Sequence, residues 1–167
     1  MAPEHEVLGW EAFGTGALEL AGLVRDDGYA PSIVLAIARG GLAPAGAVAY
    51  ALGVKNCCVI NVEYYTDIDE RLEVPIILPP ALNLVDLTAA RVLVVDDVAD
   101  TGETLKLVAD QVATYVAEVR TAVLYEKPRS IVRCEYVWSR TDRWIVFPWS
   151  ADDPIETPLP QPALDRS

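Results

Sequence analysis

Residues 92–104 read VLVVDDVADTGET and carry most of the information about the fold. The apolar run Arg91–Val95 predicts a strand that is buried on both faces, because it has no alternating polar positions. Two carboxylates, Asp96 and Asp97, follow this strand, and a helix is predicted from about Thr101 to Ala117. A buried strand that leads through a short loop into a helix is typical of an α/β domain.

The rest of the chain repeats this alternation of strands and helices. Apolar residues at helical spacing and a run of small residues predict helices over Trp10–Asp27 and Leu42–Leu52. Short apolar runs predict further strands at Ser32–Ala38, Cys57–Val62 and Thr121–Tyr125, and an edge strand at Glu135–Trp138. The fold class is therefore α/β, with a mainly parallel sheet flanked by helices and with ligands expected at the carboxyl ends of the strands.

The length of 167 residues suits one domain with a single core. We expect this domain to span residues 1–150 and the Pro-rich residues 151–167 to form an extended tail. Residues Tyr64–Glu73 are polar and without periodicity, and they are predicted to form a mobile loop. Pro79-Pro80 marks a further turn.

The net charge limits which kinds of partner the protein can bind, and the cysteines indicate the redox environment in which it works. The formal net charge is −12, so a long polyanion such as nucleic acid would be repelled. Cys57, Cys58 and Cys134 have no metal-ligand spacing and are expected to be reduced thiols. The chain shows no secretory signal and no apolar stretch of about 20 residues that could cross a bilayer. We expect a cytoplasmic protein, and we expect His5, isolated near the terminus, to be inert.

The loop that joins the strand to the helix allows two interpretations. Free N–H groups at the helix start, with hydroxyls from Thr101 and Thr104, would form a cradle for an anion. Asp100 and Thr101 could instead only cap the helix, with Asp96 and Asp97 as an exposed strand end. A carboxylate pair beside a phosphate site is explained if it accepts sugar hydroxyls or faces Mg²⁺.

The whole of residues 92–104 resembles the signature of type I phosphoribosyltransferases, which is a hydrophobic strand, two acidic residues and a Thr-Gly-x-Thr phosphate loop. Residues 36–44, AIARGGLAP, are similar to the diphosphate-binding loop of the same family. The resemblance extends over most of the chain, from about Trp10 to Trp149. It implies the type I phosphoribosyltransferase fold, a parallel sheet flanked by helices with a small hood over the site.

The resemblance also implies a role for each residue of these two segments. Asp96 and Asp97 would hold the ribose hydroxyls, directly or through Mg²⁺. Asp100, which would contact or deprotonate the purine N7, and Arg39, which would supply positive charge to the diphosphate, are the expected catalytic residues. The set expected to bind 5-phosphoribosyl diphosphate is Arg39, Gly40, Asp96, Asp97, Asp100, Thr101, Gly102, Glu103 and Thr104. Phosphate would repel the Glu103 carboxylate, so this side chain should point outward.

The last third of the chain looks like the base-binding end of bacterial xanthine-guanine phosphoribosyltransferases, at residues 125–128 (YEKP) and 142–149 (DRWIVFPW). Lys127 matches the lysine that donates to the O6 of a 6-oxopurine, and Trp144 matches the aromatic residue that stacks on the base. Backbone groups near Ile145 would face the purine C2. The alternatives are a solvated surface lysine and a tryptophan of the core.

The function implied is transfer of ribose 5-phosphate from 5-phosphoribosyl diphosphate to a 6-oxopurine (guanine, xanthine or hypoxanthine), with Mg²⁺ and release of diphosphate. One alternative is a phosphoribosyltransferase for another base, and Asp100, Lys127 and Trp144 together disfavour it. The other is a non-catalytic regulator that senses the sugar diphosphate, and the acidic charge disfavours its binding to nucleic acid. We also expect a homo-oligomer, either a dimer or a tetramer.

Overall fold

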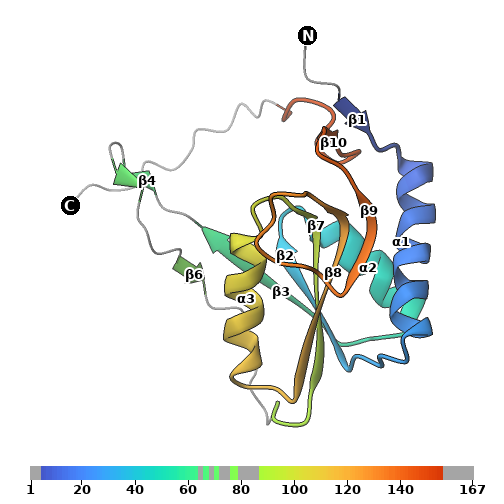
Figure 1. Cartoon of the computed structure of the whole chain (residues 1–167), viewed down its shortest axis with the longest axis vertical. Helices are drawn as coiled ribbons and strands as arrows, with labels where there is room; N and C mark the ends of the chain where they lie inside the picture. Colours follow the sequence, from blue (N-terminus) through green and yellow to red (C-terminus); the bar gives the residue numbers. More distant parts are fainter. Residues whose placement is uncertain (1–4, 64–65, 68–69, 72–75, 79–86, 156–167) are drawn as a thin grey trace.

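The computed structural model describes residues 5–63, 66–67, 70–71, 76–78 and 87–155 (Figure 1). Its helices are α1 (Trp10–Asp26), α2 (Leu42–Leu52) and α3 (Glu103–Ala113). Its strands are β1 (His5–Val7), β2 (Ile33–Ala38), β3 (Cys57–Glu63), β4 (Thr66–Asp67), β5 (Glu70–Arg71), β6 (Ile76–Leu78), β7 (Arg91–Ala99), β8 (Glu118–Glu126), β9 (Tyr136–Arg140) and β10 (Trp144–Val146).

Six of these strands form the central sheet in the order β6-β3-β2-β7-β8-β9. The pairs among β3, β2, β7, β8 and β9 are parallel, and only β6 joins antiparallel at one edge. The other edge is β9, which corresponds to the edge strand predicted over Glu135–Trp138. The predicted α/β fold with a mainly parallel sheet is confirmed.

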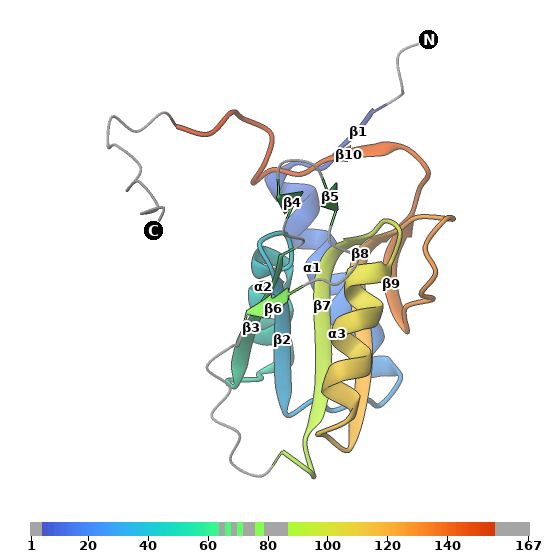
Figure 2. The same cartoon turned by 90° about the vertical axis from the view of Figure 1, so that its left-hand side faces the viewer.

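The sheet has a core on each face, and β2 contributes to both. Val34 and Ala36 belong to the cluster that packs on α1 and α2, whereas Ile33, Leu35 and Ile37 belong to the cluster that packs on α3. This alternation follows from the strand itself, since neighbouring side chains point to opposite faces. Figures 1 and 2 show the result, with α1 and α2 on one side of the sheet and α3 on the other.

The strand predicted over Arg91–Val95 is longer in the structure, and this changes the setting of the acidic pair. It continues to Ala99, so Asp96 and Asp97 lie within β7 and not after its end. The reason is that β8 is also long and pairs with β7 as far as Ala99 opposite Glu126. A paired strand holds the two carboxylates more rigidly than a loop would.

The helix predicted from Thr101 to Ala117 is shorter at both ends. It begins at Glu103 because Gly102, with φ of +80°, turns the chain at the helix start. It ends at Ala113, and the Ala117 N–H already bonds to the Ala90 carbonyl oxygen at the base of the sheet.

β1 and β10 form a separate two-stranded parallel sheet that was not predicted, in which His5 lies opposite Trp144. In Figure 1 this pair lies beyond one end of the main sheet, where the small hood was expected. The predicted loop over 64–73 is described only in β4 and β5, while Pro79-Pro80 and the tail after residue 155 lie outside the described residues. Among the helices described, none is long and apolar enough to span a membrane.

Candidate active site

A cavity of about 360 Å³ opens at the carboxyl ends of β2 and β7. Seven of the predicted ligand-binding residues line it, namely Gly40, Asp96, Asp97, Asp100, Thr101, Gly102 and Thr104. Arg39 and Glu103 are exposed beside it, each between two residues that line the cavity. The expectation that Glu103 points outward agrees with its exposure.

The turn after β2 needs its two glycines because the chain passes very close to β7. A Cβ atom at Gly40 would overlap with the carboxylate of Asp97. A Cβ atom at Gly41 would lie 2.5 Å from the Val95 carbonyl oxygen and 2.6 Å from the Ile37 carbonyl oxygen. The peptide bond before Arg39 is cis. The backbone at Gly40 therefore lies next to the Asp97 carboxylate, where no side chain would fit.

The loop after β7 leaves the start of α3 available to a ligand. Gly102 is the N-cap of α3 and supplies no side-chain cap, so the first N–H groups lack partners within the helix. The Thr101 hydroxyl oxygen accepts only a long hydrogen bond of 3.4 Å from the Glu103 N–H, and Asp100 is occupied elsewhere. This arrangement favours the anion cradle over the interpretation in which Asp100 and Thr101 only cap the helix.

Ionisation of both carboxylates on β7, Asp96 and Asp97, is electrostatically unfavourable. Burial, and then the neighbouring charge of Asp97, raise the pKa of Asp96 well above its ordinary value. Burial also raises the pKa of Asp97, against the opposing effect of N–H donors from Val98 and the Trp149 indole. The Asp97 N–H donates to Asp96 Oδ1 at 2.9 Å, and the Val98 N–H donates to Asp97 Oδ1 at 2.7 Å.

A divalent cation would relieve this charge, and the donor set fits Mg²⁺. No group of three or more His, Cys, Asp or Glu side chains forms a metal cluster in the described part of the chain. Asp96 and Asp97 alone would therefore leave most coordination positions to water or substrate. This is how Mg²⁺ is usually held in sites for phosphate substrates, by one or two carboxylates and by oxygens of the substrate.

A second cavity, also of about 360 Å³, adjoins the first. The predicted base-binding residues Lys127, Trp144 and Ile145 all line it, together with Val146, Phe147 and Ser150. Val98 and Asp100 line both cavities. A ligand that fills both would therefore have its junction beside Asp100.

Lys127 is not the solvated surface lysine of the alternative interpretation, since only 7% of the residue is exposed. Its ammonium donates to the Arg143 carbonyl oxygen at 2.7 Å and lies 3.9 Å from Asp100 Oδ1. Trp144 is not a core residue, because 61% of it is exposed at the edge of the cavity. An exposed ring beside a buried ammonium suits a planar base that carries a carbonyl oxygen.

Two residues near the site were not predicted to act there. Arg129 donates from Nε and Nη2 to the two oxygens of Asp100. Trp149 packs against Phe147, with ring centroids 5.0 Å apart, and its indole also reaches Asp97. The sequence offers a signal for Arg129, because this residue lies two positions after Lys127. It offers none for Trp149, which is brought to β7 by the fold.

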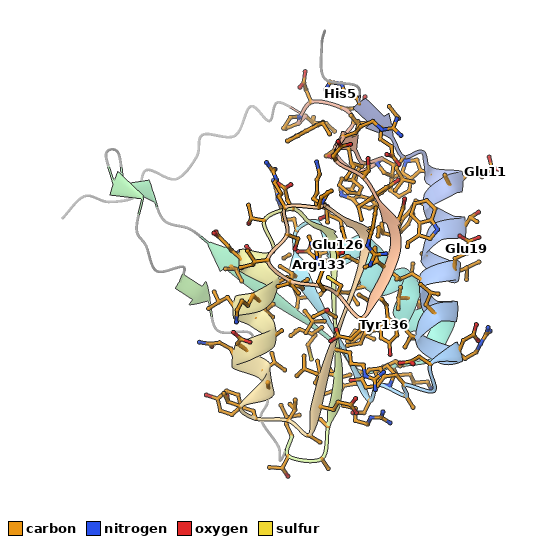
Figure 3. The ribbon with its side chains drawn as sticks, in the orientation of Figure 1. His5, Glu11, Glu19, Glu126, Arg133 and Tyr136 are labelled. Carbon is orange, nitrogen blue, oxygen red and sulfur yellow. The ribbon has the colours of Figure 1, made fainter. Side chains whose placement is uncertain are left out.

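A buried carboxylate fixes the segment that carries Lys127 and Arg129. Glu126, with its side chain 0% exposed, accepts from Arg133 at 3.3 Å, from Arg140 at 3.1 Å and from the Cys134 N–H at 2.8 Å (Figure 3). Burial alone would raise the pKa of Glu126, but these donors outweigh it and hold the pKa below its ordinary value. Glu126 is thus a charged anchor for the loop that follows β8.

Comparison with known families matches residues 5–155 to the phosphoribosyl transferase domain. The chain belongs to the phosphoribosyltransferase family. This phosphoribosyltransferase is accordingly an enzyme of the pentosyl-transferring class, and both cavities lie within the matched residues.

Several relatives resemble this phosphoribosyltransferase along most of its length. It is 34% identical to xanthine-guanine phosphoribosyltransferase of Ruegeria sp. (strain TM1040) over 139 residues, 80% of this chain and 76% of the relative. It is 30% identical to the enzyme of the same name from Nitratidesulfovibrio vulgaris over 155 residues, 90% and 87% of the two chains. The structure of purine phosphoribosyltransferase from Pyrococcus horikoshii superposes with a TM-score of 0.78 at 37% identity, covering 92% of this chain and 98% of that one.

Proposed function

We propose that this phosphoribosyltransferase transfers ribose 5-phosphate from 5-phosphoribosyl diphosphate to a 6-oxopurine and releases diphosphate. The observation that carries the proposal is that two cavities meet at Asp100, one with donors for phosphate and the other with a buried ammonium. The names of the relatives, which are purine and xanthine-guanine phosphoribosyltransferases, support the same substrate class.

The phosphoribosyl group would occupy the first cavity. N–H groups at the start of α3, with the hydroxyls of Thr101 and Thr104, would hold the 5-phosphate. Asp96 and Asp97 would hold the ribose hydroxyls and Mg²⁺, which supplies positive charge to the diphosphate when bound. Arg39, exposed beside the cavity, would add its guanidinium to the leaving diphosphate.

The base would occupy the second cavity, with its ring against Trp144 and its O6 at Lys127. In the transfer, a bond forms between a purine nitrogen and C1 of the ribose as the bond from C1 to the diphosphate oxygen breaks. Glycosyl transfers of this kind pass through oxocarbenium-like states. The purine must also lose a ring proton, and Asp100, at the junction of the cavities, is the acceptor within reach. Alignment of the two partners would supply much of the rate enhancement.

Selectivity for a 6-oxopurine should depend on Lys127, because an ammonium can only donate hydrogen bonds. Adenine would place an amino group against this buried donor, and a site built for a hydrogen bond can reject such a partner by about 10⁴-fold or more. The wild type should therefore use guanine, hypoxanthine or xanthine and reject adenine. Contacts with the backbone near Ile145 would then determine which of the three oxopurines is preferred.

The test is kcat/KM for four purines with 5-phosphoribosyl diphosphate and Mg²⁺, in the wild type and two variants. Lys127→Met should lower turnover of the oxopurines and narrow the gap to adenine, while Trp144→Ala should reduce turnover of all bases alike. Efficient use of adenine by the wild type, or unchanged oxopurine turnover in Lys127→Met, would contradict the proposal. The homo-oligomeric state and the cytoplasmic location stay predictions.

A further inference from the structure

Asp100 is held by a residue outside the segments that resemble the family signature. Arg129 Nε donates to Asp100 Oδ1 at 3.0 Å, and Nη2 donates to Oδ2. This is the parallel two-bond arrangement in which a guanidinium both neutralises a carboxylate and fixes its plane. Both oxygens of the carboxylate at the junction of the two cavities are therefore oriented from one side.

The backbone around this ion pair is fixed on both sides. The Lys127 N–H donates to the Ala99 carbonyl oxygen at 3.0 Å, and the Ile131 N–H donates to the Thr101 carbonyl oxygen at 2.8 Å. Residues on each side of Arg129 are thus bonded to the direct neighbours of Asp100. An exposed ion pair usually contributes little because two long side chains must be ordered. Here the backbone segments that carry the two side chains are already held together, so only the side chains themselves have to be ordered.

Lys127 is the other cation close to Asp100, and its role differs. Its ammonium donates to the Arg143 carbonyl oxygen at 2.7 Å and lies 3.9 Å from Asp100 Oδ1. This separation leaves the ammonium without a direct hydrogen bond to the carboxylate. Without Arg129, the strongest partner left for Asp100 would be Lys127. A direct ion pair between Asp100 and Lys127 would occupy both the carboxylate acceptor and the ammonium donor that the base needs.

We infer that Arg129 is a positioning residue that holds the Asp100 acceptor apart from the Lys127 donor, so that a purine meets both groups. The inference rests on the proposed function, in which Asp100 faces the ring nitrogen and Lys127 faces O6. In this arrangement the Arg129 side chain is engaged with Asp100 and is not itself a ligand of the base or of the sugar diphosphate. Its effect should therefore pass entirely through Asp100.

The test is a double-mutant cycle between Arg129→Gln and Asp100→Asn, followed by kcat/KM for guanine and hypoxanthine. Arg129→Gln should lower kcat/KM for the base by about 10-fold or more, the size of effect that follows loss of a residue that orients a metal-binding side chain. KM for 5-phosphoribosyl diphosphate should not change. Arg129→Lys, which keeps the charge but not the two-bond geometry, should restore part of the loss. In the Asp100→Asn background, Arg129→Gln should have little further effect.

The matched control is Arg25→Gln, because Arg25 is an exposed arginine whose ion-pair partner among the described residues is the adjacent Asp26, at 2.7 Å. Its kcat/KM should equal that of the wild type. An unchanged kcat/KM in Arg129→Gln would overturn the inference, and so would a rise, which would mean that Arg129 competes with the base. The inference would also be overturned if the losses of kcat/KM in the two single variants simply add in the double variant. Arg129 would then affect the fold in general and would not act through Asp100. A wild type without oxopurine turnover would instead overturn the proposed function, and the inference with it.

Discussion

Replacing Asp96 by asparagine should stabilise the ligand-free protein while it removes transfer activity. Burial and the adjacent charge of Asp97 raise the pKa of Asp96, so its ionised form is unfavourable in the folded state. Asparagine imitates the protonated acid, and its oxygen can still accept the Asp97 N–H that Asp96 Oδ1 accepts at 2.9 Å. The substitution therefore removes a charge without removing the hydrogen bond.

The expected gain at neutral pH is about 1–2 kcal/mol, the range typical of substitutions that relieve a destabilising functional residue. For a domain of this size each kcal/mol corresponds to about 2–4 °C in Tm. The gain should depend on pH in a definite direction. Because the folded-state pKa of Asp96 lies above the ordinary value of 3.8, the wild type loses stability as pH rises from that value through the folded-state pKa. Below this window the two proteins should differ little.

The measurement is calorimetric unfolding of both proteins without ligand, from about pH 3 to pH 8. Asp152→Asn is the matched control, because it removes one negative charge from an exposed position outside the site. Addition of Mg²⁺ and 5-phosphoribosyl diphosphate should raise the Tm of the wild type by mass action, but not that of Asp96→Asn. A lower Tm in ligand-free Asp96→Asn would refute the view that the acidic pair is strained by its own charge.

Two further substitutions test the loops on either side of this pair. Thr101→Val keeps the volume but removes a hydroxyl donor, so affinity for 5-phosphoribosyl diphosphate should fall by about 1.5–3 kcal/mol in calorimetry, and an unchanged affinity would assign Thr101 to the helix alone. Gly41→Ala would place a Cβ atom 2.5 Å from the Val95 carbonyl oxygen and should cost about 1–3 kcal/mol of unfolding free energy. Gly46→Ala, where a Cβ atom meets nothing within 4 Å, is its control and should stabilise α2 by about 0.5–1 kcal/mol.

The sequence predicts the main sheet well because most of its strands contain short apolar runs, although β7 continues beyond its predicted end at Val95 to Ala99. Leu42–Leu52 is found with the predicted bounds of α2, and Ile33–Ala38 forms β2 within one residue of the prediction. The start of α3 was placed too early, since the left-handed φ of Gly102 is a property of the turn that helical spacing does not reveal. The pair of β1 and β10 could not be predicted at all, because strands of three residues have no periodicity of their own.

The candidate site was predicted best where it is contiguous in sequence. Residues 96–104 follow one strand into one helix, so their common cavity follows from local structure. Burial of Lys127 and its bond to the Arg143 carbonyl oxygen depend on how the chain just before β10 returns to the end of β8, which spacing alone cannot give. The same is true of Trp149, whose contact with Asp97 joins positions far apart in the chain.

The two cavities share Val98 and Asp100 in their linings, and the rest of each lining comes from a different stretch of the sequence. Among the described residues, and apart from these two, the cavity proposed for the base is lined by positions between Lys127 and Ser150, whereas the cavity proposed for the sugar phosphate is lined by positions before Lys106. A change of nucleobase, whether by evolution or by engineering, could therefore be confined to one late stretch of the gene. The residues that bind and activate the sugar phosphate would then stay the same when the nucleobase changes.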